Sequence, residues 1–303
     1  MEAVMPMGRV LAPGDVKALS RRSDALGAAQ LAVHVLLIAA AAWLVSLARG
    51  DWLVLPAMLL LGWFLVALFA PVHECVHYTA FRSRRANDIV GWLAAVPGLV
   101  NFDFYKHFHY AHHRHCQDPA LDPELAPPAP RSLLAYARRV SGLVYWQARA
   151  RIAWRVLRGD FRDFPFVPER ARAQTRRSVA AMYALCILVG VGWAALDPWG
   201  PLLYWIGPVV LAQPILRYML LAEHTGCTED SNTLTNTRTT LASWPVRLVH
   251  WNMPYHAEHH LYPSIPFHAL PAAHRRIAPR LAHVTRGYAP THRAILGGLD
   301  GAR

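Results

Sequence analysis

The chain is predicted to fold as an all-α, polytopic integral membrane protein with about four transmembrane helices and a histidine-rich cap on the cytoplasmic side. Three observations predict it: long apolar runs, a one-sided distribution of arginine, and three histidine clusters outside the runs. Composition agrees, since 54% of the 303 residues are hydrophobic and the mean hydropathy is +0.18. These values are too high for an ordinary soluble enzyme.

Four apolar runs are long enough to cross a hydrocarbon core, which takes about 20 helical residues. The predicted spans cover residues 30–47, 52–71, 178–196 and 201–221. A fifth apolar stretch, 89–100, is about half that length and contains Pro97 and Gly98, so we expect it at the interface or re-entering. No signal-peptide pattern follows the first 24 residues, so the first span is expected to stay as an anchor.

Three regions follow from these runs. Residues 1–24 are expected to be a cytoplasmic N-terminal segment, 25–275 a membrane domain, and 276–303 a cytoplasmic tail. The formal net charge is +12, and the segment between the second and third spans holds 16 Arg and one Lys, whereas residues 197–200 hold none. Basic residues beside spans mark the cytoplasmic face. All three histidine clusters are therefore expected on that face.

Residues 131–158 mix apolar side chains with many arginines and predict a basic amphipathic helix on an anionic membrane surface. A DNA-contacting helix is the less favoured interpretation, and no nucleic-acid partner is predicted. The four cysteines show no paired spacing such as C-x-x-C, which argues against a disulfide framework, an iron–sulfur cluster and a zinc ribbon.

The histidine clusters carry the chemistry. Their members are spaced i, i+3 or i+4, which brings side chains to one helical face: His73 and His77; His109, His112 and His113; His256, His259 and His260. Neutral imidazole is a good ligand for iron, zinc, copper and nickel. Eight ligands exceed what one ion uses, so two metals are expected. His224, at the cytoplasmic end of the fourth span, is a candidate ninth ligand.

Two other metal chemistries share part of this pattern. His73-Glu74-x-x-His77 fits H-E-x-x-H, in which two histidines bind zinc and the glutamate is the general base of a metalloprotease. Glu74-x-x-His77 also resembles half of the carboxylate di-iron pattern, but no second copy occurs. An almost all-histidine site is favoured. A non-enzymatic metal-binding membrane protein remains a third class.

The remaining histidines are expected to be polar surface or core residues rather than ligands. They include His34, His107, His115, His268, His274, His283 and His292.

With these residues in hand, the chain resembles the membrane fatty acid desaturase superfamily, which includes membrane hydroxylases and carotenoid ketolases. The three clusters match the family's H-x(3–4)-H, H-x(2–3)-H-H and H/Q-x(2–3)-H-H boxes. Residues 117–124 and 252–263 look like the surroundings of the second and third boxes. Residues 236–240 resemble a segment of bacterial members that include rhizobitoxine-type desaturases. The resemblance covers about residues 30–275.

The resemblance implies two histidine-bound irons that use O2 to desaturate a fatty acyl chain or similar lipid, in the bacterial inner membrane. Hydroxylation or ketone formation on the same scaffold is the alternative, with a lipid, alkane, carotenoid or small polar-headed substrate. Electrons would come from an external donor: ferredoxin, cytochrome b5 or rubredoxin with its reductase.

Polar residues around the boxes are candidates for supporting roles. Residues that could orient imidazoles or hold a water are Glu74, Asp118, Asn252 and Glu258. Asp103 and Asp122 are further candidates, for which a solvated loop charge is as good an interpretation. Arg238 could pair with a substrate carboxylate or phosphate, or stabilise a loop.

Overall fold

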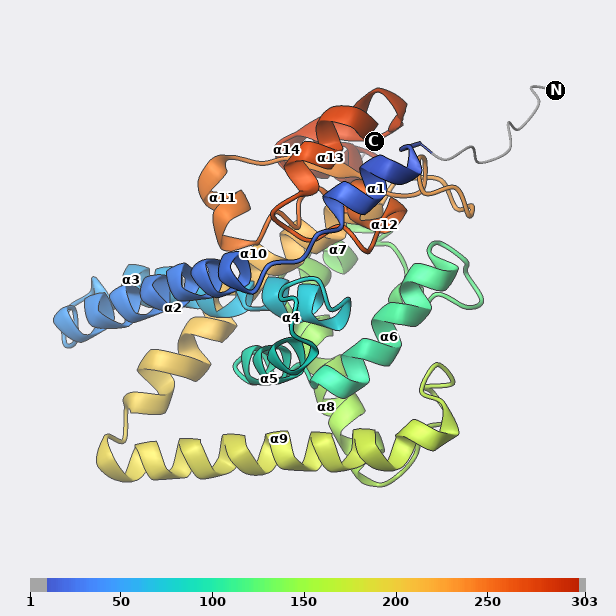
Figure 1. Cartoon of the computed structure of the whole chain (residues 1–303). Coiled ribbons are helices and arrows are strands. Elements are labelled where there is room, and N and C mark those ends of the chain that lie inside the picture. The colour runs from blue at the N-terminus through green and yellow to red at the C-terminus, as the bar shows by residue number, and fades with distance from the viewer. Residues whose placement is uncertain (1–9, 300–303) are drawn as a thin grey trace.

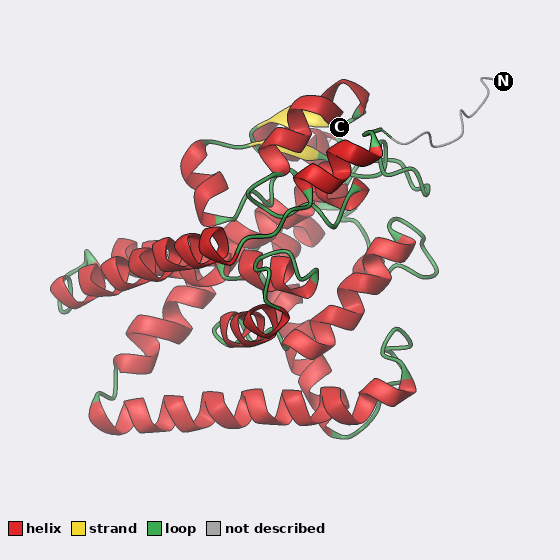
Figure 2. Cartoon of the chain, viewed as in Figure 1, coloured by secondary structure: helices red, strands yellow, loops and turns green. Residues whose placement is uncertain are grey.

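Helices make up most of the protein in the computed structural model, which describes residues 10–299 (Figure 2). Within this range, four helices are long and apolar enough to cross a membrane, as predicted. They are α2 (Asp24–Leu47), α3 with α4 (Val54–Ala67 and Phe69–Val76), α9 (Glu169–Leu196), and the π-helical turn η2 with α10 (Leu202–Ile206 and Gly207–His224). Each extends beyond its predicted apolar run into polar residues, because helical hydrogen bonding continues where the hydropathy signal stops.

The second span continues past Pro71, as the position of His73 required. A short break at Leu68 divides it into α3 and α4, and α4 carries His73 while His77 caps its C-terminal end. Proline removes one backbone donor from a helix and bends it. Beyond the break, α4 lies near the centre of the molecule (Figure 1).

Helix α3 is the packing centre of the spans, since α2 and α10 both lie against it. Gly62 permits the approach of α10: a Cβ atom there would lie 2.0 Å from the Pro208 carbonyl oxygen. At the far ends of the spans, Arg49 forms a two-pronged ion pair with Asp197, with N–O distances of 2.7 Å. This pair joins the two short loops that connect the spans.

Between the second and third spans, α5 (Arg84–Ala95) packs against α4, and α6 (Phe102–His115) follows. The Asn101 side chain accepts a hydrogen bond from the Phe104 N–H and so starts α6. The short apolar stretch predicted at 89–100 forms the end of α5 and the turn into α6. The second histidine cluster therefore lies on one continuous helix.

The basic stretch 131–158 is two helices, α7 (Leu133–Val140) and α8 (Leu143–Leu157), rather than the single helix predicted. Gly142 separates them in a left-handed conformation with φ of 84°, and a side chain there would meet Gln213 of α10. The pair packs on the spans, α7 on α10 and α8 on α9. Tertiary packing, which amphipathicity alone does not reveal, sets the break.

A cap of short elements covers the ends of α4 and α10 (Figure 1). It contains α1 (Pro13–Leu19), η1 (Pro123–Leu125), β1 (Thr239–Leu241), α11 (Trp244–Val249), α12 (His256–Leu261), α13 (Leu270–Ile277), η3 (Ala278–Arg280), β2 (Val284–Arg286) and α14 (Ala289–Gly297). The strands pair in parallel, Thr239 opposite Val284. Much of the expected tail 276–303 thus has defined structure, while residues 1–9 and 300–303 of the two expected terminal segments lie outside the described residues.

The close approach at Gly62 gives a stability prediction. Replacing Gly62 with Ala should lower the free energy of unfolding by about 1–3 kcal/mol, because the new Cβ has to push the α10 backbone away. Gly192→Ala is the matched control, since a Cβ on that α9 glycine meets nothing within 4 Å. Thermal unfolding in a mild detergent measures both; equal melting temperatures for the two variants would contradict the packing role of Gly62.

Candidate metal centre

Four helices bring nine histidines together at the junction of the spans and the cap. They are α4, α6, α10 and α12, which meet near the middle of the molecule (Figure 1). The ring nitrogens fall into two groups, within each of which one nitrogen per residue lies within 4.8 Å of the others. The first group is His73, His77, His109, His113 and His259; the second is His112, His224, His256 and His260.

Spacing between the nitrogens suits shared metal ions. Nε2–Nε2 distances in the first group are 2.8 Å for His77 and His109 and 3.0 Å for His109 and His113. In the second group the His224–His256 distance is 3.1 Å. Two imidazole nitrogens each about 2.1 Å from one ion lie about 3.0 to 3.4 Å apart at ordinary coordination angles. In addition, both ring nitrogens of His73 are buried and have no hydrogen-bond partner, which fits a residue that binds a metal ion.

Each H-x-x-H-H box supplies both groups. In α6, His109 and His113 join the first group and His112 the second. In α12 the division is reversed, with His256 and His260 in the second group and His259 in the first. The stacked rings of His113 and His260, with centroids 4.1 Å apart, lie where the groups meet. The two groups are therefore adjacent.

Burial keeps most of these imidazoles neutral. It lowers the pKa of His77 to about 3, with a further contribution from His112. Burial first, and neighbouring imidazoles next, hold the pKa well below its ordinary value for His109, His113, His256, His259 and His260. His112 differs: burial would lower its pKa, but Glu124 and Asp122 outweigh burial and raise it. Neutral imidazole is the form that binds metals.

Three carboxylates adjoin the second group. Asp122 is buried and lies 3.0 Å from His112 Nδ1, which directs the Nε2 atom of that ring into the group. Glu124 Oε2 lies 3.0 Å from His112 Nε2, and Glu223 Oε2 lies 3.5 Å from His256 Nε2. The first group has no such carboxylate among residues 10–299. The all-histidine expectation therefore describes the first group better than the second.

Glu124 and Glu223 were not singled out by sequence reasoning. Glu223 directly precedes His224, and Glu124 lies in the segment that resembles the surroundings of the second box, so both had a sequence signal. The sequence alone did not predict how the loop after α6 folds.

Glu74 and Glu258 are buried and serve as anchors rather than as partners of the nine imidazoles. Glu74 accepts hydrogen bonds from the Thr79 hydroxyl at 2.7 Å and the Phe267 N–H at 3.2 Å. Glu258 bonds to His274 of α13 and to Thr239 of β1. Glu74 thus ties α4 to the segment after the third box, and Glu258 ties α12 to the cap.

The other predicted polar residues lie outside both groups. Asp118 accepts hydrogen bonds from the Ala120 and Leu121 N–H groups and shapes its own turn. Asn252 donates to the Phe267 carbonyl at 3.1 Å. Arg238 is buried and donates to the carbonyls of Ala222 and Thr225, which favours the structural role over a substrate contact.

Asp103, another candidate, accepts hydrogen bonds from Gln174 and Ser178 of α9 and belongs to neither group.

Histidines outside the boxes hold helices together. His34 of α2 lies 2.9 Å from the Phe64 carbonyl and accepts from the Trp251 indole N–H at 3.1 Å. His292 of α14 lies 2.8 Å from the Tyr218 carbonyl. Along with His274, these residues take the polar core roles expected of them.

Comparison with known proteins identifies the family. The sequence profile described as "Fatty acid desaturase" matches residues 50–292. The chain belongs to the fatty acid desaturase family. That membership, with four apolar helices and a histidine cluster, makes it a membrane protein and an oxidoreductase of the desaturase type, in a family that uses two irons.

Three relatives illustrate the range of the fatty acid desaturase family. The Homo sapiens sphingolipid delta(4)-desaturase/C4-monooxygenase is 28% identical over 87% of this chain and 77% of its own length. The Bradyrhizobium elkanii dihydrorhizobitoxine desaturase is 28% identical over 84% of this chain and 76% of its own. The Picosynechococcus sn-1 oleoyl-lipid 12-desaturase is 28% identical over 54% of this chain and spans 48% of its own length.

Asp122 gives a test of which acid supports the histidines. Asp122→Asn should lower the metal affinity of the second group by about 10- to 100-fold, because His112 loses the carboxylate that orients it. Asp118→Asn is the matched control, four residues away and bonded only to its own turn. Metal content after dialysis against a weak chelator measures the effect. Equal losses from both variants would show that Asp122 has no special role.

Proposed function

We propose that the protein is an O2-dependent, non-haem di-iron desaturase that introduces a double bond into a fatty acyl chain or a similar lipid. The two groups of converging imidazoles carry the proposal. Their nitrogens have the spacing that two metal ions require, and the family uses iron. Relatives named for oleoyl-lipid and sphingolipid substrates support a lipid substrate.

The nine histidines would form two metal-binding positions. His73, His77, His109, His113 and His259 would hold one ion, and His112, His224, His256 and His260 the other. Glu124 and Glu223 are close enough to complete the second set. When bound, the irons supply the O2 activation and oxidising power needed to remove hydrogen from an unactivated C–H bond.

The chain's own groups prepare the site for that chemistry. Asp122 and the Asn236 carbonyl, 3.1 Å from His224 Nδ1, fix two imidazoles so that Nε2 faces the group. Burial of the cluster keeps bulk water away and holds the rings neutral. The cluster lies at the ends of α4 and α10, which belong to two of the four apolar helices, so an acyl chain dissolved in the membrane would reach it from the adjoining hydrocarbon.

Orientation and electron supply belong to the same proposal. The arginine-rich segment between the second and third spans supports a cytoplasmic active site, and bacterial relatives such as the Bradyrhizobium elkanii desaturase support the bacterial inner membrane. Electrons would arrive from an external ferredoxin, cytochrome b5 or rubredoxin with its reductase, for which the basic face offers charge complementarity.

Hydroxylation is the second candidate activity. The human relative is named as both a desaturase and a C4-monooxygenase, so one scaffold of this family carries both names. A zinc protease is disfavoured by the position of Glu74, whose carboxylate is bonded to Thr79 and Phe267. A general base must instead be free to take a proton from the attacking water.

Product analysis tests the reaction. Lipid profiling of a host that expresses the chain should reveal a product lighter than its precursor by two hydrogens, missing in a His259→Ala control. Mass spectrometry of the extracted lipids makes the measurement. A product that gains an oxygen instead would show that the reaction is hydroxylation rather than desaturation. An unchanged amount of product in His259→Ala would contradict the metal-dependent mechanism.

Metal analysis tests the two-position arrangement. The purified protein should contain about two irons per chain, and His224→Ala about one, because the four-histidine group loses a ligand while the five-histidine group is untouched. His283→Ala serves as the control, since His283 lies outside both groups. One zinc and no iron in freshly prepared protein would support the hydrolase instead.

A further inference from the structure

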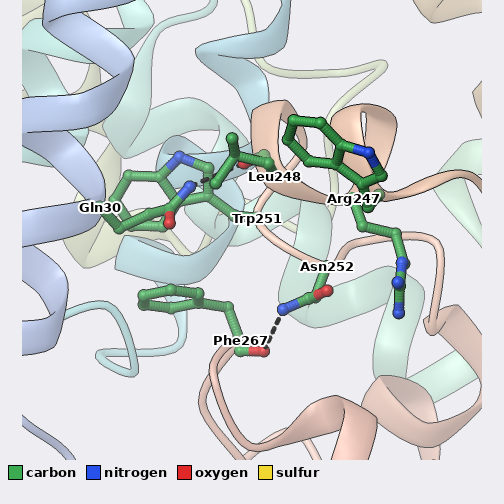
Figure 3. Close-up of a pocket in the computed structure, with 7 residues that line it drawn as sticks. Gln30, Arg247, Leu248, Trp251, Asn252 and Phe267 are labelled. Atoms are coloured by element: carbon green, nitrogen blue, oxygen red, sulfur yellow. Dashed lines mark hydrogen bonds between the residues drawn. The ribbon is translucent and has the colours of Figure 1, made fainter.

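A pocket of about 280 Å³ opens between α2 and α11, outside the metal centre (Figure 3). Gln30 from α2, Trp244, Arg247 and Leu248 from α11, and Trp251, Asn252 and Phe267 from the following loops line it. Its volume is close to the lower end of the range for small-molecule sites, about 300–1,000 Å³. Nothing in the reaction described above uses it.

Three of the seven residues that line the pocket are aromatic. Trp251 and Phe267 pack at a centroid distance of 4.8 Å and are buried, whereas Trp244 is 68% exposed at the rim. Gln30 lies about 9 Å along α2 from its start at Asp24. Exposed tryptophan beside the first turns of a span is typical of the membrane interface. The rim therefore lies where polar head groups meet acyl chains.

The polar groups of the pocket point to an anion. Arg247 is its one charged lining residue, and among residues 10–299 it forms no ion pair. Its Nη1 donates to the Tyr255 hydroxyl at 2.7 Å, while its Nε is buried and lacks an acceptor. A guanidinium that has no counter-charge and whose Nη2 forms no hydrogen bond among residues 10–299 fits a carboxylate or phosphate oxygen.

Two amides of the pocket lining have spare acceptors. Gln30 donates its amide N–H to the Leu248 carbonyl at 2.7 Å, and Asn252 donates to the Phe267 carbonyl at 3.1 Å (Figure 3). Their side-chain oxygens remain for hydroxyl or protonated groups of a ligand.

Two hydrogen bonds connect the pocket to residues next to the histidine boxes in the sequence. The Phe267 N–H donates to Glu74, which adjoins His73, and Tyr255, the partner of Arg247, directly precedes His256. We propose that this pocket binds the anionic end of an amphiphilic substrate, a carboxylate or a phosphate monoester, with Arg247 as the counter-charge and the aromatic walls around the first methylenes. The inference rests on the proposed function for treating this amphiphile as the substrate.

Binding of three amphiphiles with one chain and different heads tests the proposal. Tetradecanoate, tetradecyl phosphate and tetradecanol are titrated into the full-length protein in a non-ionic detergent, with microscale thermophoresis as the readout. At least one anion should bind about tenfold or more tightly than the alcohol, and Arg247→Gln should remove that preference. The tighter of the two anions then identifies a carboxylate or a phosphate head. Arg247→Lys, which keeps the charge, should retain part of it.

Arg275→Gln is the matched control, because it removes an exposed positive charge of the cap away from the pocket. Equal binding of all three amphiphiles by the unaltered protein overturns the proposal, whatever the folding of the variants. An anion preference that survives Arg247→Gln also overturns it. The measurement is independent of turnover: Arg247-dependent binding without oxidised product would contradict the proposed function alone, and oxidation without this binding would contradict the pocket alone.

Discussion

Nine imidazoles, most of them buried, have to lie together without accumulating positive charge, and this requirement governs the rest of the structure. Burying a polar group without a partner is costly, and burying several like charges is worse. The helices satisfy the requirement by turning the ring nitrogens toward two shared points, where metal ions would occupy their lone pairs. Three features bring the histidines together. They are the break between α3 and α4, the close packing of α3 on α10, and the cap that contains α12.

The division of ligands explains why the boxes read H-x-x-H-H. Residues four apart on a helix lie one above the other, so His109 with His113 and His256 with His260 each reach one ion position. The histidine between them, His112 or His259, projects to the side and reaches the other position. Spacing within one helix predicted that these residues share a site. It could not predict which position each takes, because that depends on how α6 and α12 are rotated against each other.

Features that depend on one segment of the sequence could be predicted, whereas features that depend on contacts between distant segments could not. The four spans follow from hydropathy, which each segment carries by itself. The choice of supporting acid does not: Asp118 and Asp122 read alike in the sequence, yet the turn after α6 directs Asp122 back to His112 and leaves Asp118 bonded to its own loop. The break at Gly142 also depends on tertiary packing, because a side chain there would meet Gln213, about seventy residues away. The sequence left two roles open for Arg238, and the contacts that favour the structural one are made with carbonyls on the end of α10 and the turn after it.

The backbone of Phe267 connects the pocket to the metal centre. Its N–H donates to Glu74, one residue from His73, and its carbonyl accepts from Asn252 at the pocket wall. Its ring packs on Trp251, whose indole N–H reaches His34 in the first span. One segment, residues 251–267, therefore supplies the third histidine box and three of the pocket's lining residues. Arg247 lies four residues before this segment, on α11, and its Nη1 donates to the hydroxyl of Tyr255, which directly precedes the α12 imidazoles. The distance between an anchored head group and the oxidising centre would therefore depend on this contact and on the hydrogen bonds of residues 251–267.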